Sequence, residues 1–141
     1  MTWHTALLGG LAEYLAANGV GVYREDGVYA DSERGIVLQT FPERPREIVA
    51  LSLYLPGGQK LSPSATQELK QSRLQIRYRL GGHPFDAVEM FDLLHSLIDQ
   101  RALDLGPIRV RGLYQSYSPM VETATGREYT TNWRFTGLAG I

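Results

Sequence analysis

The residues that could carry out chemistry are few and widely separated in this sequence. Its histidines are His4, His83 and His95, and no HExxH spacing places two of them on one helix face to bind zinc. Asp92, His95 and Asp99 follow one another at i, i+3 and i+7, which could present a metal site or an acid–base group. Carboxylates at this spacing from a histidine more often form a local ion pair on a helix surface. The histidines therefore give no strong indication of catalysis.

Nucleophile and phosphate-binding patterns are absent as well. The chain has no cysteine, which excludes disulfides, thiolate nucleophiles and Cys-ligated metal sites. Neither the P-loop pattern nor GxGxxG occurs, and the nearest glycine-rich segments, 19–21 and 57–60, predict turns. The serines lie outside any nucleophile-elbow pattern. We therefore expect a protein that is not an enzyme and that uses no cofactor or metal.

Length and composition predict one domain over residues 1–141. The chain is 43% hydrophobic, enough for a core that needs no disulfide or metal. Its 14 Lys and Arg against 15 Asp and Glu leave a formal charge of −1, which argues against a general nucleic-acid binder. No signal peptide or membrane-spanning run is apparent, so we expect a cytosolic protein.

Hydrophobic periodicity predicts two helices, over residues 3–18 and 85–101. The first contains Gly9 and Gly10 in its middle, which costs helix stability unless something packs closely against them. Strands are predicted over 36–40, 48–55, 73–80, 108–115 and 128–135. The polar stretch 56–72 predicts either a long loop or a short helix over 63–70.

This order of elements predicts an α+β fold. Amphipathic helices and alternating strands each need one apolar surface, so the economical arrangement packs both helices on one face of the sheet. We therefore expect a mainly antiparallel sheet of about four to five strands with two helices on one face, plus a protruding hairpin. Some arginines alternate with the apolar residues of the strands and therefore point away from the core. They are Arg73, Arg77, Arg79, Arg109, Arg111 and Arg134. They form either a solvated face or a contact surface for an acidic partner.

Several segments carry a resemblance to a known family. They are the helix end LAANGVG at 15–21, the strand LQIRYR at 74–79 and the helix AVEMFDLLHSL at 87–97. A strand with Ile108 and Val110 follows, and the closing hairpin contains Ser118-Pro119, then 126–128 and 131–135. In pattern and order the chain resembles the bacteriophage minor capsid or tail terminator (tail completion) family of long-tailed phages.

The resemblance implies a structural function. Such proteins form a ring, commonly of six subunits, that caps the finished tail tube, stops its polymerisation and offers a platform to the head connector or stopper protein. It implies a virion protein at the head–tail junction, assembled in the host cytoplasm, with no cofactor and no membrane contact. DNA would meet it only while passing through the ring.

Two sets of residues are candidates for these contacts. The outward arginines of one subunit are complementary in charge to the acidic side of the second predicted helix, and we expect them to meet between neighbouring subunits in a closing ring. That acidic side consists of Asp86, Glu89, Asp92 and Asp99. Alternatively the arginines line a channel for DNA.

Segments 56–72 and 117–127 are candidates for docking onto tube or connector, with Lys60, Met120 and Arg127 as the residues that we single out. A different function remains open. The chain could be a small α+β ligand-binding or regulatory module with a pocket between sheet and helices.

Overall fold

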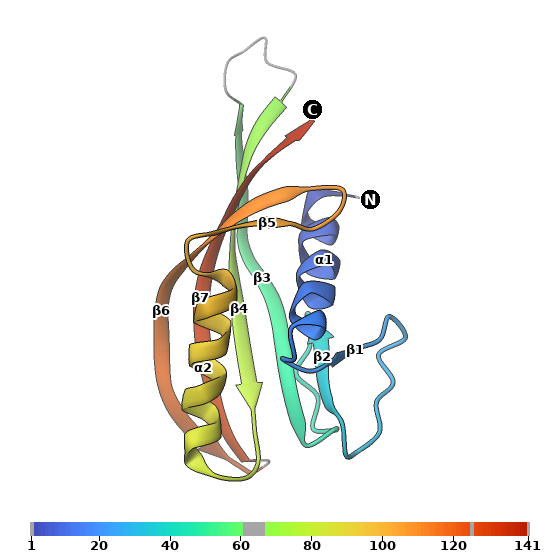
Figure 1. The fold of residues 1–141 in the computed structure, drawn as a ribbon, viewed down its shortest axis with the longest axis vertical. Helices are drawn as coiled ribbons and strands as arrows, with labels where there is room; N and C mark the ends of the chain where they lie inside the picture. Colours follow the sequence, from blue (N-terminus) through green and yellow to red (C-terminus); the bar gives the residue numbers. More distant parts are fainter. Residues whose placement is uncertain (1, 61–66, 125, 141) are drawn as a thin grey trace.

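A computed structural model describes residues 2–60, 67–124 and 126–140 and has two helices and seven strands (Figure 1). The helices are α1 (Trp3–Ala17) and α2 (Pro84–Ile98). The strands are β1 (Val22–Tyr23), β2 (Arg34–Leu38), β3 (Glu47–Lys60), β4 (Gln67–Arg79), β5 (Arg101–Asp104), β6 (Arg109–Thr123) and β7 (Gly126–Gly140). They form one sheet in the order β1-β2-β3-β4-β7-β6-β5.

The sheet is mixed and curls strongly into a half-barrel. Strands β1, β2 and β3 are parallel to one another, and all other neighbours are antiparallel. The α+β class is confirmed, but the expected four to five strands were too few. Strands β1 and β5 are too short to produce a periodic pattern, so they are detected only by their pairing.

Both helices share one buried core with one face of the sheet, which we call the inner face. The alternation in β4 buries Leu74, Ile76 and Tyr78 on this face, where they meet Leu11 of α1 and Leu94 of α2. A strand places successive side chains on opposite faces, so the arginines that alternate with these residues lie on the outer face.

The ends of α2 depend on polar side chains. His83 is its N-cap: Nδ1 accepts a hydrogen bond from the Phe85 backbone at 3.1 Å, and the Asp86 carboxylate accepts one from His83 N at 3.2 Å. The helix ends at Ile98 rather than at residue 101 as predicted. Gln100 has a left-handed backbone with φ 57°, and the chain then enters β5.

Within segment 56–72, the described residues 56–60 and 67–72 belong to a three-stranded arm and not to a loop or helix. Strand β3 pairs with β4 from 57 to 60, and β4 pairs with the last residues of β7. The predicted helix over 63–70 is wrong for residues 67–70, which are strand, and the rest of it lies outside the described residues. Figure 1 shows β3, β4 and β7 continuing past both helices. The sequence lacks apolar alternation here because no helix covers this part of the sheet.

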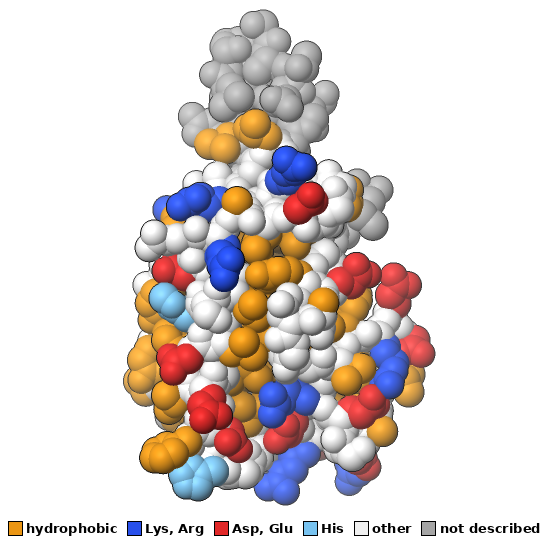
Figure 2. All heavy atoms as spheres, in the orientation of Figure 1, with side chains coloured by type: hydrophobic (Ala, Val, Ile, Leu, Met, Phe, Trp, Pro, Cys, Tyr) orange, Lys and Arg blue, Asp and Glu red, His pale blue; other side chains and the backbone are white. Residues whose placement is uncertain are grey.

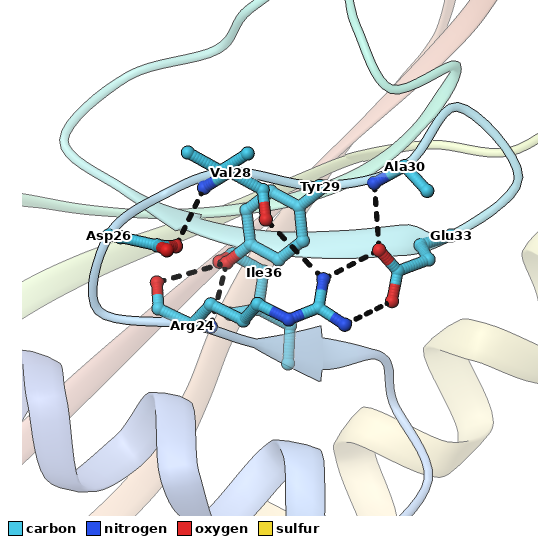
Figure 3. Close-up of polar contacts among 7 residues, drawn as sticks. All are labelled: Arg24, Asp26, Val28, Tyr29, Ala30, Glu33 and Ile36. Carbon is cyan, nitrogen blue, oxygen red and sulfur yellow. Dashed lines mark hydrogen bonds and ion pairs between the residues drawn. The ribbon is translucent and has the colours of Figure 1, made fainter.

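The outer face is partly covered by the chain itself, whereas we expected either a solvated face or a contact surface for a partner. Val37, Ile48 and Ala50 form a second buried cluster there under Tyr29 and Phe41, which come from the connections 24–33 and 39–46. In the first connection the Arg24 guanidinium donates to both Glu33 carboxylate oxygens, at 2.6 and 2.7 Å (Figure 3). The Tyr29 hydroxyl donates to the Ile36 carbonyl at 2.5 Å. The exposed part of the outer face is therefore centred on β4, β7 and β6.

Candidate functional site

The predicted outer-face arginines do share one face, but they fall into two groups. The sheet register places Arg73 opposite Arg134, Arg79 opposite Glu128, and Arg111 opposite Thr136. Near the end of β4 the arginines have partners within the chain. Toward the arm, Arg73, Arg111 and Arg134 have no ion-pair partner among the described residues.

Arg79 belongs to the first group, and its side chain is buried rather than offered to a partner as predicted. It is 2% exposed, and its guanidinium donates to the backbone carbonyls of Arg46 at 2.8 Å and of Pro42 and Glu43 at 2.9 Å. Burial lowers the pKa of Arg79, but an arginine keeps its charge at neutral pH. Arg79 therefore fastens the connection 39–46 to the sheet.

Arg77 is also largely committed within the chain. Its guanidinium pairs with the Glu128 carboxylate and lies 4.2 Å from the centroid of the Phe41 ring. The Glu128 carboxylate compensates the charge that we had expected on a partner surface, and the cation–π contact holds the guanidinium against Phe41. A charge reversal at Arg77 would therefore disturb the fold as well as any interface.

The remaining arginines form a cluster that we define as Arg73, Arg111 and Arg134, the arginine cluster. The structure gives none of the three an ion pair with any described residue. The Nε atom of Arg134 is buried and has no hydrogen-bond partner among the described residues. Nearby, Arg109 is exposed and 3.6 Å from the Asp104 carboxylate, a weak surface pair. Like charges directly opposite each other destabilise a sheet, so this cluster has a cost within the isolated chain.

The residues of the predicted acidic side of α2 also fall into two groups. Asp86 caps the helix, and Asp99 lies at its C-terminal end, where one carboxylate oxygen accepts from the Tyr114 backbone at 2.8 Å and the other lies 3.4 Å from His95 Nε2. Glu89 and Asp92 are exposed, and the structure gives neither an ion pair with any described residue. The acidic surface is therefore narrower than expected.

The spacing of Asp92, His95 and Asp99 does not assemble a metal site. The structure brings together only His95 and Asp99, and in the described ranges no three histidine or carboxylate side chains could hold a metal ion. His95 packs instead among aromatic rings, including Phe91 and Tyr114.

An apolar surface on α2 was missed by the sequence analysis. Phe85 and Val88 are 69% and 58% exposed, although both have large hydrophobic side chains. Beside them a hollow of about 270 Å³ opens between α2 and the sheet, lined by Tyr78, Ala87, Val88, Phe91, Tyr117 and Tyr129. In the sequence, Phe85 and Val88 do not lie on the same helix face as the buried residues of α2. This position could have indicated that they are exposed. Figure 2 shows acidic side chains down α2 with hydrophobic ones at its edge.

A second hollow of about 540 Å³ lies where α2 begins. It is open and polar, and its lining includes Arg46, His83, Glu122, Arg127 and Tyr129. Arg79 contributes to its wall while its guanidinium bonds to the carbonyls described above. The hollow lies at one end of the sheet, outside the apolar core.

The predicted docking residues of the β6–β7 hairpin are exposed. Met120 is 44% exposed, and Arg127 lies 3.6 Å from the Glu122 carboxylate. The side chain of Lys60 lies outside the part that the structure describes, although its backbone belongs to β3. No helix in the described ranges is long and apolar enough to cross a membrane. No protein-family model matches the chain, and no curated protein matches it either.

Proposed function

We propose that this chain is the tail terminator subunit of a long-tailed bacteriophage. In this role it associates with copies of itself into a ring, most simply a hexamer, and caps the end of the tail tube. The ring stops tube polymerisation and offers its other side to the head–tail connector. No substrate is converted, and no cofactor takes part.

The observation that carries this proposal is the arm formed by β3, β4 and β7. It continues past both helices, so neither helix covers this part of the sheet. Leu138 in the arm pairs with Leu69 of β4 and is 47% exposed. An extension of the sheet that neither helix covers is available for contact with another protein.

Charge distribution supports self-association. Glu89 and Asp92 face outward from α2 on the inner side of the sheet, and the arginine cluster lies on the outer face. One copy can therefore offer an acidic surface while its neighbour offers a basic one. A contact between two different surfaces forms a ring if its rotation closes. The protein would then reside at the head–tail junction of the virion, with DNA passing through the ring.

The test is to mix the purified protein with polymerising tail tubes and to examine the tube ends by electron microscopy. We expect the protein to decorate the ends and to stop elongation. Leu138→Lys should lower the fraction of decorated ends, because it places a charge on the arm. The matched control is Val28→Lys, which changes another exposed aliphatic residue, 67% exposed, in the connection between β1 and β2. Bare tube ends with the unchanged protein would contradict the proposal.

A small ligand-binding or regulatory module is the second candidate. It is favoured by the polar hollow of about 540 Å³, a size within the usual range of ligand pockets. Light scattering separates the two functions. A protein that stays monomeric at high concentration, ignores tube ends and binds a small molecule in this hollow would be such a module.

A further inference from the structure

The arginine cluster has the charge and form of half of a protein interface. Arg73 and Arg134 lie directly opposite each other in the antiparallel pair β4–β7. Side chains in such a pair have Cβ atoms about 4.5–5.5 Å apart. Arg111 comes from the next strand, with its Thr136 partner two positions beyond Arg134 on the same face. Three cations thus occupy one patch.

Nothing in the described chain compensates this charge. Arg77 and Arg79 show that this sheet supplies partners to its other arginines, through Glu128 and through the carbonyls of the connection 39–46. Arg134 has a buried Nε with no hydrogen-bond partner, and a buried donor without an acceptor is unfavourable. Carboxylates of a second molecule would compensate the positive charge of the cluster and could accept a hydrogen bond from Arg134.

The complementary half lies on α2. Glu89 and Asp92 are exposed and lie three residues apart, so their Cβ atoms are about 5–6 Å apart along the helix surface. This separation matches that of Arg73 and Arg134. Phe85 and Val88 flank the two carboxylates and are the large apolar side chains that α2 leaves most exposed. The outer face offers Leu113, which lies opposite Arg134 in the register, as an apolar neighbour of the cluster.

Addition of a partner strand to the edge of β6 fits less well. The backbone N–H of Tyr114 is already bonded to Asp99, and the β6–β7 register is irregular between Tyr114 and Ser116 and again between Ser118 and Val121. Pro119 lies in the second irregularity. Bulges, prolines and inward-pointing charges protect a sheet edge from pairing. These features therefore favour a contact between faces over strand addition.

We propose that α2 of one copy docks onto the arginine cluster of the next, with Glu89 and Asp92 on Arg73 and Arg134. The two surfaces lie on opposite sides of the subunit, so no chain can satisfy its own cluster, and each copy binds two neighbours. This inference rests on the proposed self-association and specifies the residues that meet. Opposite charges at such an interface give specificity and make association weaker as salt rises.

Cysteine pairing tests the contact directly, because the natural chain contains no cysteine. One variant carries Arg73→Cys and another carries Asp92→Cys, and the two are mixed at high concentration under mild oxidation. We expect the disulfide-linked heterodimer to exceed both homodimers several-fold. The matched control replaces Asp92→Cys with Glu13→Cys, at an exposed position of α1, and should show no excess. No excess over this control would overturn the inference.

Charge exchange gives an independent readout that a folding defect cannot imitate. Arg73→Glu with Arg111→Glu in one variant, and Glu89→Lys with Asp92→Lys in another, should each lose self-association measured by sedimentation. Mixing the two variants should restore it, because each supplies the surface that the other now needs. Failure of mixing to restore association also counts against the contact. If rings still form on tube ends while both tests fail, the interface is wrong and the tail terminator function stands. If tube ends stay bare as well, both are wrong.

Discussion

The guanidinium of Arg79 donates a hydrogen bond to the backbone carbonyl of Arg46 at 2.8 Å, deep under the connection that joins two parallel strands. Further bonds reach the carbonyls of Pro42 and Glu43. Parallel strands cannot be joined by a tight hairpin, and here no helix covers the crossing. The Arg79 side chain therefore supplies hydrogen bonds to several carbonyls of this connection.

We expect Arg79→Leu to lower the free energy of unfolding by about 3 kcal/mol. It removes the charged donors and leaves several poorly solvated carbonyls without partners, each of which costs about 1–3 kcal/mol before relaxation. The measurement is urea denaturation, in which we expect the midpoint to fall while the dependence of the unfolding free energy on urea concentration stays unchanged. Arg73→Leu, at an exposed position of the same strand, should shift the midpoint little. Equal shifts in the two variants would contradict a structural function of Arg79.

Thr131 connects two strands and an indole inside the core. Its hydroxyl donates to the Ile76 carbonyl at 2.8 Å and accepts from Trp133 Nε1 at 2.8 Å, and Thr131 is fully buried. Thr131→Val keeps the shape but removes both hydrogen bonds and leaves the buried Trp133 Nε1 without its acceptor, so we expect a loss of about 1–3 kcal/mol in unfolding free energy. Thr131→Ser retains the hydroxyl and should lose less. A valine variant as stable as the serine variant would show that the hydroxyl contributes nothing.

Gly9 and Gly10 should respond to alanine in opposite directions. A Cβ at Gly10 would lie 2.7 Å from Leu105 Cβ and 3.0 Å from its carbonyl oxygen, whereas a Cβ at Gly9 meets nothing within 4 Å. Alanine in a helix interior gains up to about 1 kcal/mol over glycine. Overpacking costs about 1–3 kcal/mol. We therefore expect Gly9→Ala to raise the melting temperature and Gly10→Ala to lower it. A rise in both would mean that Leu105 moves away freely.

Glu33 makes stability depend on pH in the acid range. The hydrogen bonds from Arg24, followed by the backbone N–H of Ala30, lower the pKa of Glu33 from 4.5 to about 2 (Figure 3). Because the folded-state pKa is lowered, this contribution is complete above pH 4.5 and is lost as the pH falls through about 2. As the pH falls from 4.5 to about 2, the free energy of unfolding should therefore decrease less for Glu33→Gln than for the unchanged protein.

The acid dependence is measured as unfolding free energy against pH by chemical denaturation. The control is Glu13→Gln, at an exposed position of α1, which should keep the slope of the unchanged protein. Identical slopes for the unchanged protein and Glu33→Gln would show that the bonds in Figure 3 do not persist in solution.

Local pattern was sufficient for the main elements. The strict alternation in β4 and the apolar stripe of α2 follow from the periods of strand and helix, so the sequence alone indicated both elements and the face of the arginines. It also raised the question of a close contact at Gly9 and Gly10. It could not say which glycine makes that contact, because Leu105 is distant in sequence.

The availability of each arginine was decided by the tertiary structure. The alternation of residues along β4 places Arg73, Arg77 and Arg79 on one face. Arg79, however, is bonded to the connection 39–46 and Arg77 to Glu128, and both partners are remote in sequence. The same is true of the arm, whose strands show no apolar alternation in the sequence and are defined by pairing alone. Periodicity reports which side of an element a residue occupies. Partners, burial and strand order depend on contacts between segments far apart in the chain, which only the folded structure brings together.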